Sequence, residues 1–89
     1  MQTLHIKVKG KVQGVFYRAT AREVAGEIGL QGWVRNTEDG DVEIMATGSD
    51  EQLQAFLGWC RKGPSGARVD DVVFSQKDET TFEGFSIIR

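Results

Sequence analysis

The sequence predicts an α+β protein in which two helices cover one face of an antiparallel sheet. Two observations lead to this prediction. Several short segments alternate apolar and polar residues with the period of a strand, and two longer segments repeat apolar residues three and four positions apart, as helices do. These segments follow one another in the order strand, helix, strand, strand, helix, strand, which allows both helices to lie on one side of a single sheet.

The first predicted strand lies near the N-terminus. Apolar residues alternate with His5 and Lys7 between Leu4 and Val8, and the strand is expected to end near Gly10. Because successive side chains of a strand point to opposite faces, we expect His5 on the face of the sheet that lies away from the core.

A loop and the first helix are expected next. Residues 11–17 follow neither period and contain Gly14, which indicates a loop. The following residues predict a helix from about Arg18 to Ile28, with Gly29 at the position of a C-terminal cap. Its apolar stripe consists of Ala21, Val24, Ala25 and Ile28.

Two further strands are expected to form an antiparallel hairpin. The alternating segments 32–36 and 42–47 are separated by a short connection that contains Asp39 and Gly40. An Asp-Gly pair favours a tight turn between paired strands, because glycine readily adopts the positive φ that such turns require. The alternation places Asn36 on the same face as Val34.

The second helix is expected over Asp50–Lys62. Ser49 and Gln52 have the spacing of a capping box, and Gly63, which precedes a proline, ends the helix. Its apolar stripe consists of Leu53, Phe56, Leu57 and Cys60.

The C-terminal part of the chain predicts one more strand and a short closing strand. The segment from Val69 to Phe74 is rich in β-branched and aromatic residues, but its apolar phase changes across Asp70-Asp71, which indicates a bulge. Phe85 and Ile87 mark the closing strand. No linker or repeat interrupts the chain, so residues 1–89 are expected to form a single ferredoxin-like βαββαβ domain.

The composition restricts the classes of partner. The net charge of −2 provides no overall positive field for a nucleic acid or an anionic membrane, so an anion site has to be local. Cys60 is the only cysteine, so the chain cannot form an internal disulfide or a cysteine-rich metal site. The N-terminus does not resemble a signal peptide, and no apolar run reaches membrane-spanning length. We therefore expect a cytoplasmic protein.

The segment 12–18 joins the first strand directly to the first helix. Helix N-termini have unpaired N–H groups and about half a positive charge, so a loop that contains Gly14 can wrap its amides around a phosphate. Arg18 would add a planar, charged fork that matches two phosphate oxygens. The same residues also fit a solvated turn with Arg18 on the surface, and Asn36 also fits a residue that merely ends its strand.

No other group in the sequence competes for a catalytic role. His5, the only histidine, is expected on the sheet surface. Asp70 and Asp71 are adjacent in a strand and point to opposite faces, so they cannot act as a paired acid and base. Cys60 lies on the apolar stripe of its helix and is expected in the core. No cluster of ligands indicates a metal site.

Two longer motifs resemble the signature segments of the acylphosphatase family. They are GKVQGVFYR at residues 10–18 and GWVRNTEDG at residues 32–40. The separation of the two motifs, the length of the chain and the order of the elements are also similar to that family. One position differs, because the family usually has phenylalanine where this chain has Tyr17. If it is buried, the added hydroxyl needs a hydrogen-bond partner.

The resemblance implies a small stand-alone acylphosphatase, which hydrolyses acyl phosphates to a carboxylate and inorganic phosphate without a metal or other cofactor. It implies that Arg18 binds the substrate phosphate and that Asn36 orients the attacking water. Backbone amides of the phosphate-binding loop would complete the cradle, namely those of Gln13, Gly14, Val15, Phe16, Tyr17 and Arg18. Inorganic phosphate, the product, would be a competitive inhibitor. We expect a monomer that binds neither nucleic acid nor membrane.

Two other functions fit parts of the sequence. Ferredoxin-like domains include RNA-binding modules, and Trp33 and Met45 are expected on the open sheet face, but residues 40–48 contain no aromatic residue and the net charge is negative. Alternatively, the domain keeps a phosphate cradle as a sensor or as a relic of a larger carbamoyl-transfer enzyme. The short chain is an argument against the relic.

Overall fold

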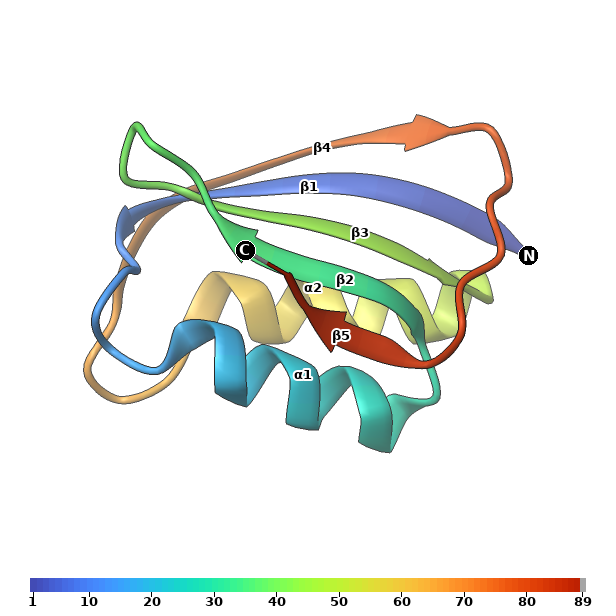
Figure 1. Cartoon of the computed structure of the whole chain (residues 1–89), viewed down its shortest axis with the longest axis horizontal. Coiled ribbons are helices and arrows are strands. Elements are labelled where there is room, and N and C mark those ends of the chain that lie inside the picture. The colour runs from blue at the N-terminus through green and yellow to red at the C-terminus, as the bar shows by residue number, and fades with distance from the viewer. Residues whose placement is uncertain (89) are drawn as a thin grey trace.

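The computed structural model describes residues 1–88 and contains one sheet with two helices on one of its faces (Figure 1). No helix among these residues is both long and apolar enough to cross a membrane. In chain order the elements are β1 (Gln2–Lys11), α1 (Tyr17–Ile28), β2 (Gln31–Asn36), β3 (Val42–Gly48), α2 (Asp50–Lys62), β4 (Arg68–Lys77) and β5 (Phe85–Ile87).

The sheet has the strand order β4-β1-β3-β2-β5. The pairs β4–β1, β1–β3 and β3–β2 are antiparallel, as the sequence predicts, and the ferredoxin-like order of strands and helices is present. The prediction of a purely antiparallel sheet is wrong at one edge, because β5 pairs parallel with β2.

The direction of β5 follows from the path of the chain. The antiparallel pairs from β4 to β2 make β4 run opposite to β2. Residues 78–84 lead from the end of β4 across that end of the sheet to the start of β5 (Figure 1). The chain therefore reverses relative to β4 and runs parallel to β2 along the edge.

Both helices begin and end close to the predicted residues. The N–H of Gly29 donates to the carbonyl of Ala25 and ends α1. At the start of α2, the N–H of Gln52 donates to Ser49 Oγ while Gln52 Oε1 accepts from the N–H of Ser49. The predicted capping box is thus confirmed.

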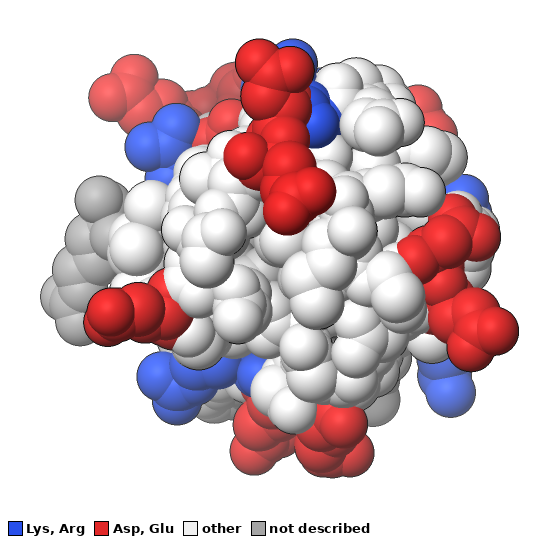
Figure 2. Space-filling view, turned by 90° about the vertical axis from the view of Figure 1, so that its right-hand side faces the viewer, with Lys and Arg blue, Asp and Glu red and all other residues white. Residues whose placement is uncertain are grey.

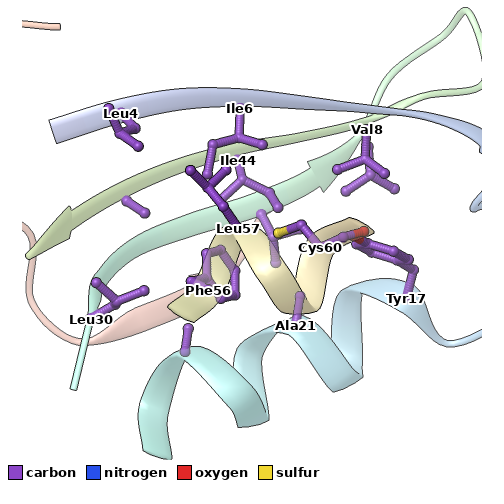
Figure 3. Close-up of a cluster of buried hydrophobic side chains, with 14 of the residues drawn as sticks. Leu4, Ile6, Val8, Tyr17, Ala21, Leu30, Ile44, Phe56, Leu57 and Cys60 are labelled. Atoms are coloured by element: carbon purple, nitrogen blue, oxygen red, sulfur yellow. The ribbon is translucent and has the colours of Figure 1, made fainter. Parts of the chain in front are cut away.

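The core lies between the helices and the covered face of the sheet. Figure 3 shows Ile6 and Ile44 of the sheet facing Leu57 of α2, and all three side chains are inaccessible to solvent. Cys60 is also fully buried in this cluster, which confirms its prediction as a core residue. Most buried apolar residues come from the predicted strands and helix stripes, whereas Val12, Tyr17 and Leu30 lie outside them. The full set is Leu4, Ile6, Val8, Val12, Tyr17, Ala21, Ala25, Leu30, Val34, Val42, Ile44, Ala46, Leu53, Phe56, Leu57 and Cys60.

The predicted bulge is present in β4. Lys9 pairs with Asp71 and the next residue, Gly10, pairs with Val69, so Asp70 is the extra residue. Gly10 has a φ of 128°, and a Cβ atom at this position would lie 2.2 Å from the carbonyl oxygen of residue 68. Only glycine therefore allows β1 to approach the bulge so closely.

On the open face of the sheet, Glu43 joins side chains from two neighbouring strands. It pairs with His5 Nε2 at 2.5 Å and accepts a 2.6 Å hydrogen bond from Arg35 Nε. His5 therefore lies on the predicted face. Burial alone would raise the pKa of Glu43, but the hydrogen bonds from His5 and Arg35 outweigh this effect and lower the pKa below its usual value.

The lowered pKa of Glu43 predicts a specific dependence of stability on pH. Ionised Glu43 stabilises the fold above its unfolded-state pKa of about 4.3, and this contribution is lost as the pH falls through the lower folded-state pKa. Glu43→Gln should lower the free energy of unfolding by about 1–2 kcal/mol at pH 7, with a difference that shrinks toward pH 3. Urea unfolding between pH 3 and 7 measures this effect, and Glu38→Gln, at an exposed hairpin position, is the control. A difference independent of pH would contradict the prediction.

Candidate active site

The connection between β1 and α1 forms a pocket of about 340 Å³ together with the ends of β2 and β5. It brings Arg18 and Asn36 together, although they lie on different elements. The residues that line it are Val12, Gly14, Phe16, Tyr17, Arg18, Ala19, Asn36 and Ile87.

The opposite end of the molecule carries acidic and basic side chains around an uncharged centre (Figure 2).

Strand register positions Asn36 beside the loop. Val42 of β3 pairs with Val8 on one side and with Asn36 on the other. The chain that leaves β1 therefore emerges at the same end of the sheet as Asn36, and α1 begins beside that end.

Most of the residues predicted for the site line this pocket, but two do not. Gln13 and Val15 are not among the lining residues, and Val15 packs against the core instead. Sequence reasoning missed three lining residues, which are Val12, Ala19 and Ile87. The alternation in the last strand indicates that Ile87 belongs to a strand, but it carries no signal that this strand lies beside β2.

The first turn of α1 differs from that of α2. Its N-cap is Phe16, which makes no side-chain capping hydrogen bond, and its first turn contains no acidic residue. In contrast, α2 has the Ser49 capping box and two acidic residues in its first turn. The N–H groups at the start of α1 are therefore not capped by a side chain, and Arg18 and Ala19 of this turn line the pocket.

Gly14 gives the loop its shape. It has a φ of 75°, which is favourable only for glycine, and no atom lies within 4 Å of the position that a Cβ would occupy. The requirement for glycine is therefore conformational, and it lets the backbone turn around the pocket.

The two polar side chains in the pocket have unused hydrogen-bonding capacity. Within residues 1–88, the guanidinium of Arg18 forms no ion pair or hydrogen bond, although the residue is only partly exposed. The Oδ1 atom of Asn36 is buried and has no hydrogen-bond partner in the same range. A buried polar atom without a partner is uncommon in folded proteins and is typical of a functional site.

The side chain of Gln13 has a role that the sequence did not reveal. Its Nε2 donates 2.8 Å hydrogen bonds to the carbonyl oxygens of Thr37 and Asp41. Both acceptors belong to the hairpin that follows Asn36. Gln13 thus holds the loop and the hairpin together at the pocket.

Comparison with known proteins identifies the family. A family model described as acylphosphatase matches residues 4–87. The chain belongs to the acylphosphatase family. An acylphosphatase of Methylococcus capsulatus is 47% identical over 90 residues, which cover 100% of this chain and 98% of that protein.

Solved structures contain the same fold. The crystal structure of acylphosphatase from Bacillus subtilis has a TM-score of 0.97 and 34% identity, and the match covers 100% of both chains. A crystal structure of T. kodakarensis HypF contains a similar region, with a TM-score of 0.82 and 35% identity. That match covers 98% of this chain but only 12% of HypF.

Tyr17, the position where this chain departs from the usual acylphosphatase motif, is buried. Only 1% of its surface is exposed, and its hydroxyl donates a 2.8 Å hydrogen bond to the carbonyl oxygen of Cys60 at the end of α2 (Figure 3). Its ring centre lies 5.0 Å from that of Trp59. Burial raises the pKa of the Tyr17 hydroxyl far above its usual value, so the hydroxyl remains protonated and donates this bond.

The other reactive groups are occupied or lie outside the pocket. Burial raises the pKa of the Cys60 thiol to about 12, so the thiolate nucleophile is not formed at neutral pH. No group of three or more histidine, cysteine or acidic residues with metal-binding geometry occurs in the part of the chain that the structure describes. Trp33, which the RNA-binding alternative requires for base stacking, lies 5.3 Å beneath the guanidinium of Arg35.

Removal of the Tyr17 hydroxyl should weaken the attachment of the loop to α2. Tyr17→Phe keeps the ring and its packing but leaves the buried carbonyl of Cys60 without this donor. We expect the free energy of unfolding to fall by about 1 kcal/mol, as measured by urea denaturation. The variant should retain its activity, because the aromatic packing remains. An unchanged unfolding midpoint would show that the hydrogen bond contributes nothing to stability.

Proposed function

We propose that this chain is an acylphosphatase that hydrolyses acyl phosphates, which are carboxyl-phosphate anhydrides, in the pocket between α1 and β2. The observation that carries the proposal is the meeting of three unsatisfied groups in one pocket. These are the uncapped start of α1, the guanidinium of Arg18 and the amide oxygen of Asn36, the last two without a partner among residues 1–88. Membership of the acylphosphatase family supports it independently.

Arg18 and the loop amides are proposed to bind the phosphate. The positively charged guanidinium offers two parallel N–H groups that match two phosphate oxygens. Backbone N–H groups from Gln13 to Arg18 and the dipole of α1 would stabilise the remaining negative charge. Among the described residues, no acidic side chain lines this pocket, which favours an anion there.

Asn36 is proposed to orient the attacking water. Its side chain can accept one hydrogen bond and donate another without adding a charge that would repel the phosphate. Because it lies at the end of β2, in register with Val42, its position is set by the sheet and not by a mobile loop. Such fixed alignment in line with the P–O bond reduces the entropic part of the barrier.

The chemistry explains why a site this simple suffices. The leaving group of an acyl phosphate is a carboxylate, a weak base that departs without protonation by a general acid. The remaining tasks are to align a water and to stabilise the oxygens of a loose phosphoryl transition state. The side chains of this pocket match both tasks, so we propose a reaction that needs no metal or other cofactor.

The proposal includes the partners of the protein. Inorganic phosphate, as product, would occupy the same cradle and act as a competitive inhibitor. The residues of the pocket all come from one chain, which favours an active monomer. The negative net charge is unfavourable for nucleic acids and anionic membranes, and the single buried cysteine is compatible with a cytoplasmic location.

The first test is hydrolysis of benzoyl phosphate in the presence of EDTA, followed by the ultraviolet absorbance of the substrate. We expect turnover that persists in EDTA and that inorganic phosphate inhibits competitively. Folded protein without turnover would refute the proposed activity. Turnover abolished by EDTA and restored by a metal would refute the cofactor-free reaction alone.

Two substitutions separate the proposed roles. Arg18→Ala should raise both KM and the inhibition constant of phosphate, and should lower kcat/KM by about 10³-fold. Asn36→Ala should lower kcat by about 10²-fold while it leaves the inhibition constant of phosphate nearly unchanged.

The control is Arg22→Ala, which removes an exposed arginine one turn further along α1 that does not line the pocket. It should leave all three constants unchanged. If Asn36→Ala kept full activity, the role proposed for that residue would be wrong. If Arg18→Ala and Arg22→Ala behaved alike, the role proposed for Arg18 would be wrong.

A further inference from the structure

Phe16 has two features that folding does not explain. Its side chain is 82% exposed, which makes it the most exposed of the large hydrophobic residues in the described chain. It is also the only non-glycine residue among residues 1–88 with a positive φ, at 63°. The left-handed conformation is unfavourable for a residue with a Cβ, and the exposed ring gains nothing from burial in the core.

The position of Phe16 in α1 is also unusual. It is the N-cap residue, where Ser, Thr, Asp, Asn or Gly normally satisfies the first N–H groups of a helix. Its backbone is nevertheless well fixed, because its carbonyl oxygen accepts hydrogen bonds from the N–H of Thr20 at 3.1 Å and from Thr20 Oγ1 at 2.9 Å. The ring is therefore attached to a rigid part of the chain. Strain and broken local rules of this kind are typical of functional sites.

The ring lies at the pocket, together with other apolar side chains. Val12, Phe16 and Ile87 provide an apolar lining, whereas Arg18 and Asn36 provide the polar groups. A volume of about 340 Å³ is in the range of pockets that bind whole small molecules. The pocket thus combines an anion-binding part with an apolar part.

We propose that Phe16 is a specificity-determining residue that packs against the acyl group of the substrate. The protein then prefers acyl phosphates with an aromatic acyl group to those with a small acyl group such as acetyl. This inference rests on the proposed function, because it assumes that the phosphate occupies the cradle. With the phosphate oxygens held by Arg18 and the loop amides, the acyl group would extend into the rest of the pocket, which Phe16 lines.

The physical basis is the large contact area of an aromatic ring and its low cost in conformational entropy. A phenylalanine side chain has only two rotatable bonds, and the backbone of Phe16 is already fixed before the substrate binds. Aromatic pairs gain about 0.5–1.5 kcal/mol beyond their area burial, which corresponds to a gain in affinity of about twofold to thirteenfold. A methyl group in place of a phenyl group would lose most of this contact.

The test compares benzoyl phosphate with acetyl phosphate. Phe16→Ala should lower the ratio of kcat/KM for benzoyl phosphate to kcat/KM for acetyl phosphate by about tenfold. Phe16→Tyr, which keeps the ring, should retain the preference. Phe74→Ala is the matched control, because Phe74 is a second exposed phenylalanine, on β4 and outside the pocket. The Phe74→Ala substitution should change kcat/KM for neither substrate.

A second measurement is decided by the wild-type protein and so does not depend on the folding of a variant. Phenylphosphonate should inhibit wild-type protein more strongly than methylphosphonate, and Phe16→Ala should remove this difference. Equal inhibition by the two phosphonates in the wild type would overturn the inference.

The outcomes distinguish the inference from the function on which it rests. If Phe16→Ala slowed both substrates equally and weakened phosphate binding, Phe16 would shape the cradle, and the inference would be wrong. It would also be wrong if neither substrate were affected. Wild-type protein that hydrolysed neither substrate would overturn the proposed function, whereas wild-type turnover with no role for Phe16 would overturn this inference alone.

Discussion

The double pairing of β3 is the constraint on which the site depends. Val42 is in register with Val8 on one neighbouring strand and with Asn36 on the other, so the end of β1 and the end of β2 lie at the same edge of the sheet. The loop that follows β1 has to emerge beside Asn36, and α1 has to begin there. Because the covered face of these strands is buried, a shift of one residue would expose the core, which fixes the register and with it the site.

Much of this arrangement could be predicted from sequence periodicity, because the helices and strands that build the fold are amphipathic. The helices, the hairpin, the capping box at Ser49 and the bulge at Asp70 were predicted from local patterns. Two kinds of feature could not be predicted from local patterns. The parallel pairing of β5, which brings Ile87 to the pocket, depends on where the chain crosses the sheet. The bonds of the Gln13 side chain to the hairpin join segments that no local pattern relates. Resemblance to a family indicated the polar site residues, but not these long-range contacts.

The two helices show how stability and the site make opposite demands on the same local structure. The start of α2 is capped by Ser49 and carries acidic residues that complement the helix dipole. The start of α1 has none of these stabilising features, and the strained Phe16 takes the place of the cap. An acidic residue or a capping side chain there would compete with an anion for the same N–H groups. The less stable helix start is therefore the one that remains free to bind.

The hydrogen bond from Tyr17 to Cys60 has a consequence for motion in the protein. It ties the first turn of α1 to the last turn of α2, with the Tyr17 ring enclosed beside Trp59. The first turn of α1 cannot move away from α2 without removing a buried aromatic ring from the core. Displacement of this turn is thus coupled to disruption of the core and is not a local fluctuation. An anion held by the loop, as proposed, would therefore shift the folding equilibrium of the whole chain, and it would bind to a pocket that is already formed.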